Sequence, residues 1–247
     1  MRLFGLIGQP LTHSFSASYF AEKFDRENRS DCNYQLFPLE KIEEFPALLA
    51  SHPSLIGLNV TIPYKEVVLP YLTASCLPAG LDACNCIYIN KGKCEGYNTD
   101  YIGFEKSLLP LLQPRIQAAM IFGNGGAAKA VRYVLKKIGI PYTVVGRTET
   151  PGIDKAFYSL TASDIQAHQL LINTTPLGTY PAITGYPPIP YEAVGAGHIL
   201  YDLVYNPSIT AFLKAGEERG ARIKNGVELL QIQAEESWKI WNQTDKR

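Results

Sequence analysis

The feature that most constrains the fold of this 247-residue chain is the segment Ala119–Ala130 (AMIFGNGGAAKA). Apolar residues lead into a glycine-rich turn, and helix-forming residues follow. Glycines let the backbone approach a pyrophosphate, while the N–H groups at a helix start stabilise its negative charge. We therefore predict a dinucleotide site, and a purely structural strand–helix turn is the alternative. The predicted cofactor-binding residues of this turn are Gly123, Asn124, Gly125, Gly126 and Ala127.

The strand after this turn, predicted at Tyr142–Val145, leads into Gly146, Arg147 and Thr148. An acidic residue at this place typically binds the ribose 2′-hydroxyl of NAD, whereas a planar arginine cation suits the 2′-phosphate of NADP. The sequence therefore favours NADP over NAD. A solvated arginine at the strand end is the alternative, and Glu149 two residues further on weakens the preference.

Apolar runs alternate with segments of helical spacing along most of the chain. This alternation predicts an α/β fold with mostly parallel sheets, and the length predicts two domains. The expected early strands are Leu3–Ile7, Tyr34–Phe37, Leu55–Val60 and Asn85–Ile89, and the expected helices are Ser16–Arg29, Lys41–Ala50 and Asp100–Leu112. A second α/β register begins near residue 118. Pro176–Pro190 is predicted to be a long loop.

Charge and cysteine content exclude several functional classes. The 23 basic and 23 acidic residues balance, so we expect no nucleic-acid partner and no membrane-surface partner. No stretch approaches the roughly 18 apolar residues of a membrane helix. We therefore expect a cytoplasmic protein. The five cysteines lack the spacing of a zinc site, so we expect reduced thiols and no metal.

Three polar clusters accompany the predicted early strands. They lie at Gly8–Ser16, at Asn59–Glu66, and at Asn85 with Gly96–Asp100. The carboxyl edge of a parallel sheet is where α/β proteins bind ligands, and this set of hydroxyls, amides and charges fits a small polyhydroxylated acid. Each cluster also has a plainer explanation. Ser14, Ser16 or Asp100 can cap a helix, and Lys65 can be a solvated surface residue.

With these residues assembled, the chain resembles the shikimate dehydrogenase family over nearly its whole length. The motifs that carry the resemblance are G-x-P-x-x-H-S-x-S at Gly8–Ser16, N-V-T-x-P-x-K-E at Asn59–Glu66, N-T-D-x-x-G-F at Asn98–Phe104, G-x-G-G-A at Gly123–Ala127, N-x-T-P-x-G at Asn173–Gly178 and Y-D-x-x-Y-x-P at Tyr201–Pro207. Several ordered motifs are far more specific than a glycine turn alone.

The resemblance implies an NADP-dependent oxidoreductase that acts on a CH–OH group. It would reversibly reduce 3-dehydroshikimate to shikimate with NADPH, in chorismate and aromatic amino acid biosynthesis. The resemblance also implies two domains. Residues 1–101 and 229–247 would form a substrate-binding catalytic domain, and residues 102–228 a Rossmann-like NADP-binding domain. We expect a monomer or a homodimer.

The resemblance further assigns roles to individual residues. Lys65 and Asp100 would be the catalytic pair. The implied substrate-binding residues are Ser14, Ser16, Thr61, Asn85, Asp100, Tyr205 and Gln233, and the implied cofactor-binding residues outside the glycine turn are Arg147, Thr148, Leu203 and Gly226.

Four positions depart from the family pattern. Ala17 replaces the usual proline, Phe20 a common histidine, Gly146 the usual asparagine, and Pro151 a second basic residue that often contacts the 2′-phosphate. NAD use therefore stays open. The alternatives are a quinate/shikimate dehydrogenase that uses NAD and a non-catalytic, ligand-binding regulator. Retention of both Lys65 and Asp100 argues against the regulator, because binding alone does not need a proton donor.

Overall fold

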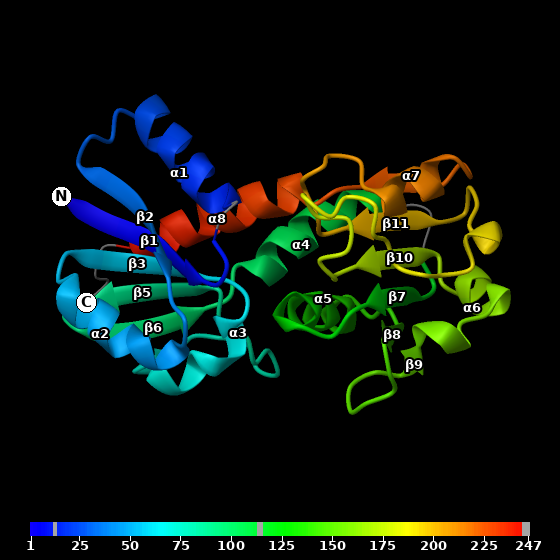
Figure 1. Ribbon diagram of the computed structural model, residues 1–247, viewed down its shortest axis with the longest axis horizontal. Coiled ribbons are helices and arrows are strands. Elements are labelled where there is room, and N and C mark those ends of the chain that lie inside the picture. The colour runs from blue at the N-terminus through cyan, green and yellow to red at the C-terminus, as the bar shows by residue number, and fades with distance from the viewer. Residues whose placement is uncertain (12–13, 113–115, 244–247) are drawn as a thin grey trace. The chain divides into compact units, whose positions relative to one another are not determined.

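The computed structural model describes residues 1–11, 14–112 and 116–243, and it forms two compact units (Figure 1). Residues 1–103 and 230–247 belong to the first unit, and residues 104–229 to the second. Both boundaries fall within helices, in α4 (Asp100–Leu108) and α8 (Val227–Trp241).

A six-stranded sheet in the order β2-β1-β3-β5-β6-β4 organises the first unit. Its strands are β1 (Arg2–Gly8), β2 (Cys32–Pro38), β3 (Leu55–Val60), β4 (Ala74–Ser75), β5 (Cys86–Asn90) and β6 (Lys93–Tyr97). β5 runs antiparallel to both of its neighbours, whereas β1 pairs in parallel with β2 and β3. The start of β5 and the end of β6 therefore lie at the same edge as the carboxyl ends of β1 and β3.

Helices cover both faces of this sheet. Successive side chains of a strand point to opposite faces, so Leu3 and Ile7 of β1 pack with residues of α2 (Phe45–Ser51) and α3 (Tyr64–Val67). Phe4 instead packs with aromatic residues of α1 (Phe15–Arg26) and α8. The Trp241 indole N–H donates to the Ile87 carbonyl, 3.0 Å away, which holds the end of α8 on the sheet.

The sheet of the second unit is entirely parallel, with the strand order β12-β11-β10-β7-β8-β9. Its strands are β7 (Ala119–Phe122), β8 (Tyr142–Gly146), β9 (Lys155–Ala156), β10 (Leu170–Asn173), β11 (Ile199–Asp202) and β12 (Arg222–Lys224), and its helices include α5 (Gly126–Lys137), α6 (Ala162–Ala167) and α7 (Ala211–Glu217). This is the doubly wound dinucleotide-binding order, in which the direction of winding reverses between β7 and β10. The predicted α/β class with mostly parallel sheets is confirmed.

The three predicted early helices are shorter than the sequence indicated: α1 ends at Arg26 rather than Arg29, and the other two each contain a proline. The segment 41–50 divides into the 3-10 helix η1 (Ile42–Glu44) and α2, whose first turn contains Pro46. The segment 100–112 is helical only to Leu108 and continues as the 3-10 helix η3 (Leu109–Leu111), which contains Pro110. Proline supplies no N–H to the helical ladder, so it fits a helix start better than a helix interior. The other 3-10 helices are η2 (Leu69–Tyr71), η4 (Phe157–Ser159) and η5 (Tyr191–Ala193).

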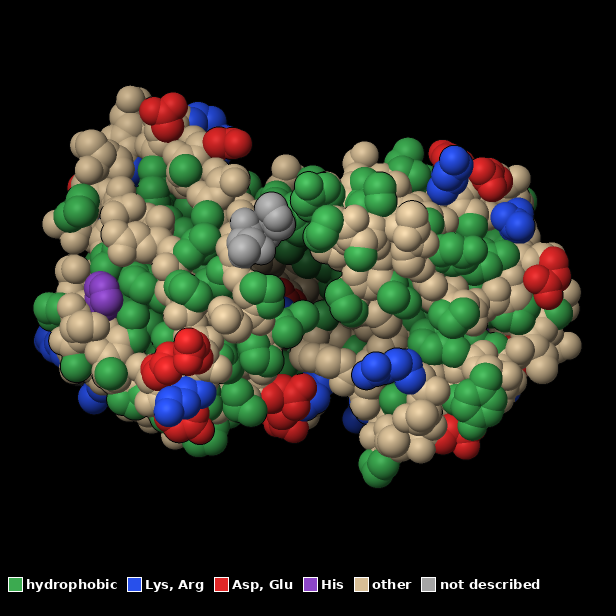
Figure 2. All heavy atoms as spheres, viewed as in Figure 1, with side chains coloured by type: hydrophobic (Ala, Val, Ile, Leu, Met, Phe, Trp, Pro, Cys, Tyr) green, Lys and Arg blue, Asp and Glu red, His purple; other side chains and the backbone are tan. Residues whose placement is uncertain are grey.

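The surface charges and the cysteines are those of an ordinary globular protein. Acidic and basic side chains are interspersed on the face shown in Figure 2. Within the described ranges, no helix combines the length and apolar character that crossing a membrane requires. The five cysteines are free, and Cys84, Cys86 and Cys94 are buried.

Candidate active site

A lysine–aspartate ion pair lies at one edge of the first sheet. The Lys65 ammonium, on the short helix α3, donates to Oδ2 of Asp100 at 2.6 Å. The two side chains are only 15% and 13% exposed. Water and salt screen the attraction between two charges less when the charges are mostly buried. The pair is therefore held together more strongly than a surface pair. The plainer explanation of Lys65 as a solvated surface residue is therefore wrong.

Asn85 joins this pair because β5 runs antiparallel to its neighbours. It lies just before β5, and its Nδ2 group donates to Oδ1 of Asp100 at 2.7 Å. Its Oδ1 accepts from the Thr99 backbone N–H at 2.6 Å. Asp100 thus accepts one hydrogen bond on each carboxylate oxygen, and the carboxylate is fixed in orientation.

Helix α8 adds Gln233 to the same cluster. Oε1 of Gln233 accepts from the Thr99 hydroxyl at 3.4 Å and from Nδ2 of Asn85 at 3.5 Å. Ser237, one turn further along α8, lies 3.2 Å from the Thr99 hydroxyl and accepts from Nδ2 of Asn59 at 3.0 Å. Thr99, Ser237 and Asn59 were not among the predicted site residues. Asn59 and Thr99 do lie inside two of the motifs, which was the available signal.

The other predicted residues of the first unit occupy different local roles. The Ser14 hydroxyl accepts from the Ala17 N–H at 3.3 Å and caps α1, which is the alternative raised by the sequence. Ser16 lies near the Tyr34 hydroxyl, which donates to Oδ1 of Asn59 at 2.9 Å, and burial raises the pKa of Tyr34 well above its ordinary value. Thr61 is half-buried after β3, and its backbone N–H donates to the Ile7 carbonyl at 3.0 Å. Thr12 and His13 of the same motif lie outside the described residues.

The glycine turn of the second unit has the backbone that a dinucleotide needs. Gly123 has a φ of +104°, and a Cβ there would lie 2.8 Å from Oγ1 of Thr174. The turn after β7 therefore approaches the segment after β10 closely, at the point where the winding reverses. Gly125 caps α5 without a side-chain hydrogen bond, and no described atom lies within 4 Å of the position of a Cβ. These features fit a bound pyrophosphate.

The other predicted cofactor residues lie at the carboxyl ends of β8 and β11. Arg147 and Thr148 are exposed immediately after β8. Gly226 is buried against the segment after β11: its N–H donates to the Val204 carbonyl at 3.1 Å, and a Cβ there would collide with the Leu203 carbonyl oxygen. Tyr205, predicted to bind substrate, belongs to the same segment of the second unit and is half-buried.

A buried carboxylate that was not among the predicted site residues organises the same end of this sheet. Asp202 accepts from Nδ2 of Asn173 at 2.9 Å, from the Val204 N–H at 3.0 Å and from the Thr210 hydroxyl at 2.6 Å. Burial raises the pKa of Asp202 to about 6, although these hydrogen bonds oppose the shift. Asp202, the last residue of β11, thereby ties the segment after β11 to the end of β10.

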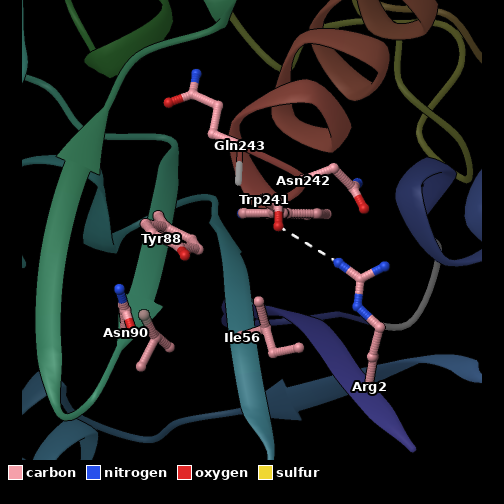
Figure 3. A pocket seen from close by; sticks show the side chains of 8 residues that line it. Arg2, Ile56, Tyr88, Asn90, Trp241, Asn242 and Gln243 are labelled. Atoms are coloured by element: carbon pink, nitrogen blue, oxygen red, sulfur yellow. Dashed lines mark hydrogen bonds between the residues drawn. The ribbon is translucent and has the colours of Figure 1, made fainter. Parts of the chain in front are cut away.

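A cavity of about 480 Å³ lies at the opposite edge of the first sheet (Figure 3). It is lined by Arg2, Ile56, Tyr88, Ile89, Asn90, Trp241, Asn242 and Gln243. The Arg2 guanidinium donates to the Trp241 carbonyl at 3.4 Å. This cavity is formed at the starts of β1 and β3, so it is not part of the Lys65–Asp100 cluster.

The second unit contains a doubly wound sheet with a glycine turn, and the first unit holds an ion pair on a polar sheet edge. These features are those of a dinucleotide-dependent α/β oxidoreductase. Residues 6–87 match the model of the shikimate dehydrogenase substrate binding domain. The match and the relatives described next show that the chain belongs to the shikimate dehydrogenase family.

Relatives resemble the chain over almost its full length. It is 37% identical to the NADP(+) shikimate dehydrogenase of Clostridium beijerinckii, with 98% of this chain and 93% of the relative covered. It is 34% identical to the corresponding enzyme of Carboxydothermus hydrogenoformans, with 97% and 91% covered. The crystal structure of a chorismate mutase/shikimate 5-dehydrogenase fusion protein from Clostridium acetobutylicum superposes with a TM-score of 0.84 at 31% identity, with 100% of this chain and 92% of that chain covered.

Proposed function

We propose that this protein catalyses the reversible, NADPH-dependent reduction of 3-dehydroshikimate to shikimate. The observation that carries this proposal is the largely buried Lys65–Asp100 pair, held by Asn85 at a polar sheet edge. We propose that the first unit binds the substrate and the second unit binds the cofactor. Family membership supports the reaction, and the described contacts support the roles of the residues.

Lys65 is the proposed proton donor. Reduction of a ketone produces an alkoxide, which needs a proton as it forms, and a lysine ammonium is a donor at neutral pH. The bound NADPH supplies the hydride. In the reverse direction the Lys65 amine accepts the proton of the substrate hydroxyl. Asp100 orients the ammonium through their 2.6 Å hydrogen bond.

Asn85, Gln233 and Thr61 are the proposed residues that recognise substrate hydroxyls together with Asp100. Asn85 and Gln233 are only 3% and 5% exposed, so an unpaired polar atom there would be costly. A site built from such groups rejects analogues that lack the matching hydroxyl. Ser14 and Ser16, which also belong to the first unit, are proposed contacts of the same substrate.

Gly123–Ala127 is the proposed pyrophosphate site, and Arg147 with Thr148 is the proposed 2′-phosphate site. Leu203 and Gly226 are further proposed cofactor-binding residues. The positive φ of Gly123 and the uncapped start of α5 support the first assignment. The exposed guanidinium of Arg147 directly after β8 supports the second.

The test is an absorbance assay of the reduced nicotinamide with four mixtures: shikimate or quinate, each with NADP or NAD. We expect the highest kcat/KM with shikimate and NADP. A higher kcat/KM with quinate and NAD than with shikimate and NADP would instead identify a quinate/shikimate dehydrogenase that uses NAD. Absence of turnover in all four mixtures would favour a ligand-binding protein without catalysis.

A further inference from the structure

The segment after β8 contains too little positive charge to balance a phosphate group by itself. Residues 147–154 (RTETPGID) contain one cation, Arg147, and two carboxylates, Glu149 and Asp154. A phosphate monoester carries nearly two negative charges near neutral pH, and its recognition usually needs more than one charged donor. If this segment receives the 2′-phosphate of NADP, a second cation must come from elsewhere in the fold.

Arg132 on α5 is directed toward this place. Side chains of an α-helix lean toward its N-terminus, and Arg132 lies in the second turn of α5. Its Nη1 atom donates to Oδ1 of Asn124 at 3.0 Å. Asn124 is part of the glycine turn, so the guanidinium of Arg132 lies directly beside the proposed pyrophosphate site.

The end of the segment after β8 contacts the same two side chains. Gly152 has a φ of +88°, and a Cβ at this residue would lie 2.9 Å from Nδ2 of Asn124 and 3.8 Å from Nη1 of Arg132. The Arg132 guanidinium is therefore near both the turn after β7 and the loop after β8. These are the two segments between which the adenosine ribose of a dinucleotide lies in doubly wound folds.

Arg132 also lacks a counter-ion in the part of the chain that the structure describes. Lys137 on the same helix pairs with Glu105, and Lys155 pairs with Asp164, but Arg132 is paired with no carboxylate. Its side chain is half-buried. An arginine has five N–H donors in a planar fork, and the Asn124 bond uses one of them. The remaining N–H groups can donate to the oxygens of a phosphate group.

We infer that Arg132 is a specificity-determining residue for NADP, supplying from α5 the second cation that contacts the 2′-phosphate together with Arg147. This inference rests on the proposed function, because it assumes that the second unit binds NADP. Asn124 is a positioning residue in this arrangement, since it holds the guanidinium by its hydrogen bond.

The test compares binding of two cofactor fragments by calorimetry: adenosine 2′,5′-bisphosphate, which carries the 2′-phosphate, and 5′-AMP, which does not. Arg132→Ala should raise the Kd of the bisphosphate about 10–100-fold, as expected for loss of a charge-assisted hydrogen bond. The Kd of 5′-AMP should change less than about threefold. Arg132→Lys should retain part of the preference, because it keeps the charge and loses the fork.

Two further variants separate charge recognition from a structural role. Arg222→Ala removes an exposed arginine from β12, which is the edge strand at the end of the sheet away from β8. It should leave both Kd values unchanged. Pro151→Arg in the Arg132→Ala background places a new cation in the exposed loop after β8 and should restore much of the preference for the bisphosphate.

Three results would overturn the inference: equal weakening of both fragments by Arg132→Ala, no weakening of either, or a wild-type protein without preference for the bisphosphate. The first would assign Arg132 to the structure of the glycine turn. The proposed function is judged separately, from turnover of shikimate by the wild-type protein. A wild-type enzyme that oxidises shikimate while Arg132→Ala leaves the fragment preference intact would contradict this inference alone.

Discussion

Lys65 donates a 2.6 Å hydrogen bond to Oδ2 of Asp100, although the two residues are 35 positions apart in the chain. The other carboxylate oxygen accepts from Asn85. Asp100 therefore keeps one fixed orientation and directs the lysine ammonium. The proposed proton donor therefore has a defined position, and general acid catalysis requires such a position in addition to binding.

Removal of the Lys65 ammonium should reduce turnover rather than binding. We expect Lys65→Ala to lower kcat by about 10²–10⁴-fold, the usual contribution of general acid–base catalysis, with little change in the KM for shikimate. Steady-state kinetics with shikimate and NADP provides the measurement. Lys93→Ala, at an exposed position of β6, is the matched control. A near-normal kcat in Lys65→Ala would exclude Lys65 as the proton donor.

Arg147 should discriminate between the two cofactors. Arg147→Ala should weaken NADP about 10–100-fold and NAD by less than about threefold, because only NADP carries the phosphate that the guanidinium would contact. KM values for both cofactors at saturating shikimate test this expectation. Equal losses for NADP and NAD would mean that Arg147 does not contact the 2′-phosphate.

Asp202 should make folding stability depend on pH. Its folded pKa is about 6, above the value of about 3.9 for an unfolded aspartate. Between about pH 4 and 6 the folded state therefore binds more protons at this group than the unfolded state, and the contribution of Asp202 to the free energy of unfolding falls as pH rises. A difference of about two pKa units corresponds to at most about 3 kcal/mol.

Asp202→Asn isolates this contribution. The amide keeps an oxygen that can accept from Asn173 and Val204, while its NH₂ can donate to the Thr210 hydroxyl. Urea unfolding at pH 4, 5, 6 and 7 should show that wild type loses stability relative to the variant across the window. A constant difference between the two proteins over this range would contradict the assignment.

Gly57 should be intolerant of a side chain. A Cβ at this residue of β3 would collide with the Trp241 indole, so Gly57→Ala should lower the free energy of unfolding by about 1–3 kcal/mol through overpacking. Gly195→Ala is the control, since no described atom lies within 4 Å of its Cβ position and its φ is not positive. It should change stability by less than about 0.5 kcal/mol. Similar effects of the two substitutions would show that α8 can shift without cost.

Much of the fold could be predicted from local patterns. The glycine turn and the apolar runs predicted where most strands and helices lie along the chain, although the helices proved shorter than predicted. The direction of β5 could not be predicted, because a strand has the same apolar alternation in either direction. That direction decides that Asn85, at the start of its strand, reaches the same edge as Lys65 and Asp100.

The surroundings of Arg132 could not be predicted from the sequence either. Its position on α5 is typical of a solvated helix surface, and no motif includes it. Only the folded chain shows that its guanidinium reaches Asn124 and the loop at Gly152. Asp202 lies inside a motif, but its burial and its raised pKa depend on partners from three segments.

The sequence by itself determined the class of fold, the dinucleotide turn and the types of side chain available for chemistry, because these depend on neighbours within a few positions. The tertiary structure decided which of those side chains meet. Asn85 and Gln233 are 148 positions apart, yet they approach within 3.5 Å. A hydrogen bond depends on distance and angle to within a fraction of an ångström, and only the packing of strands and helices sets those values across such separations.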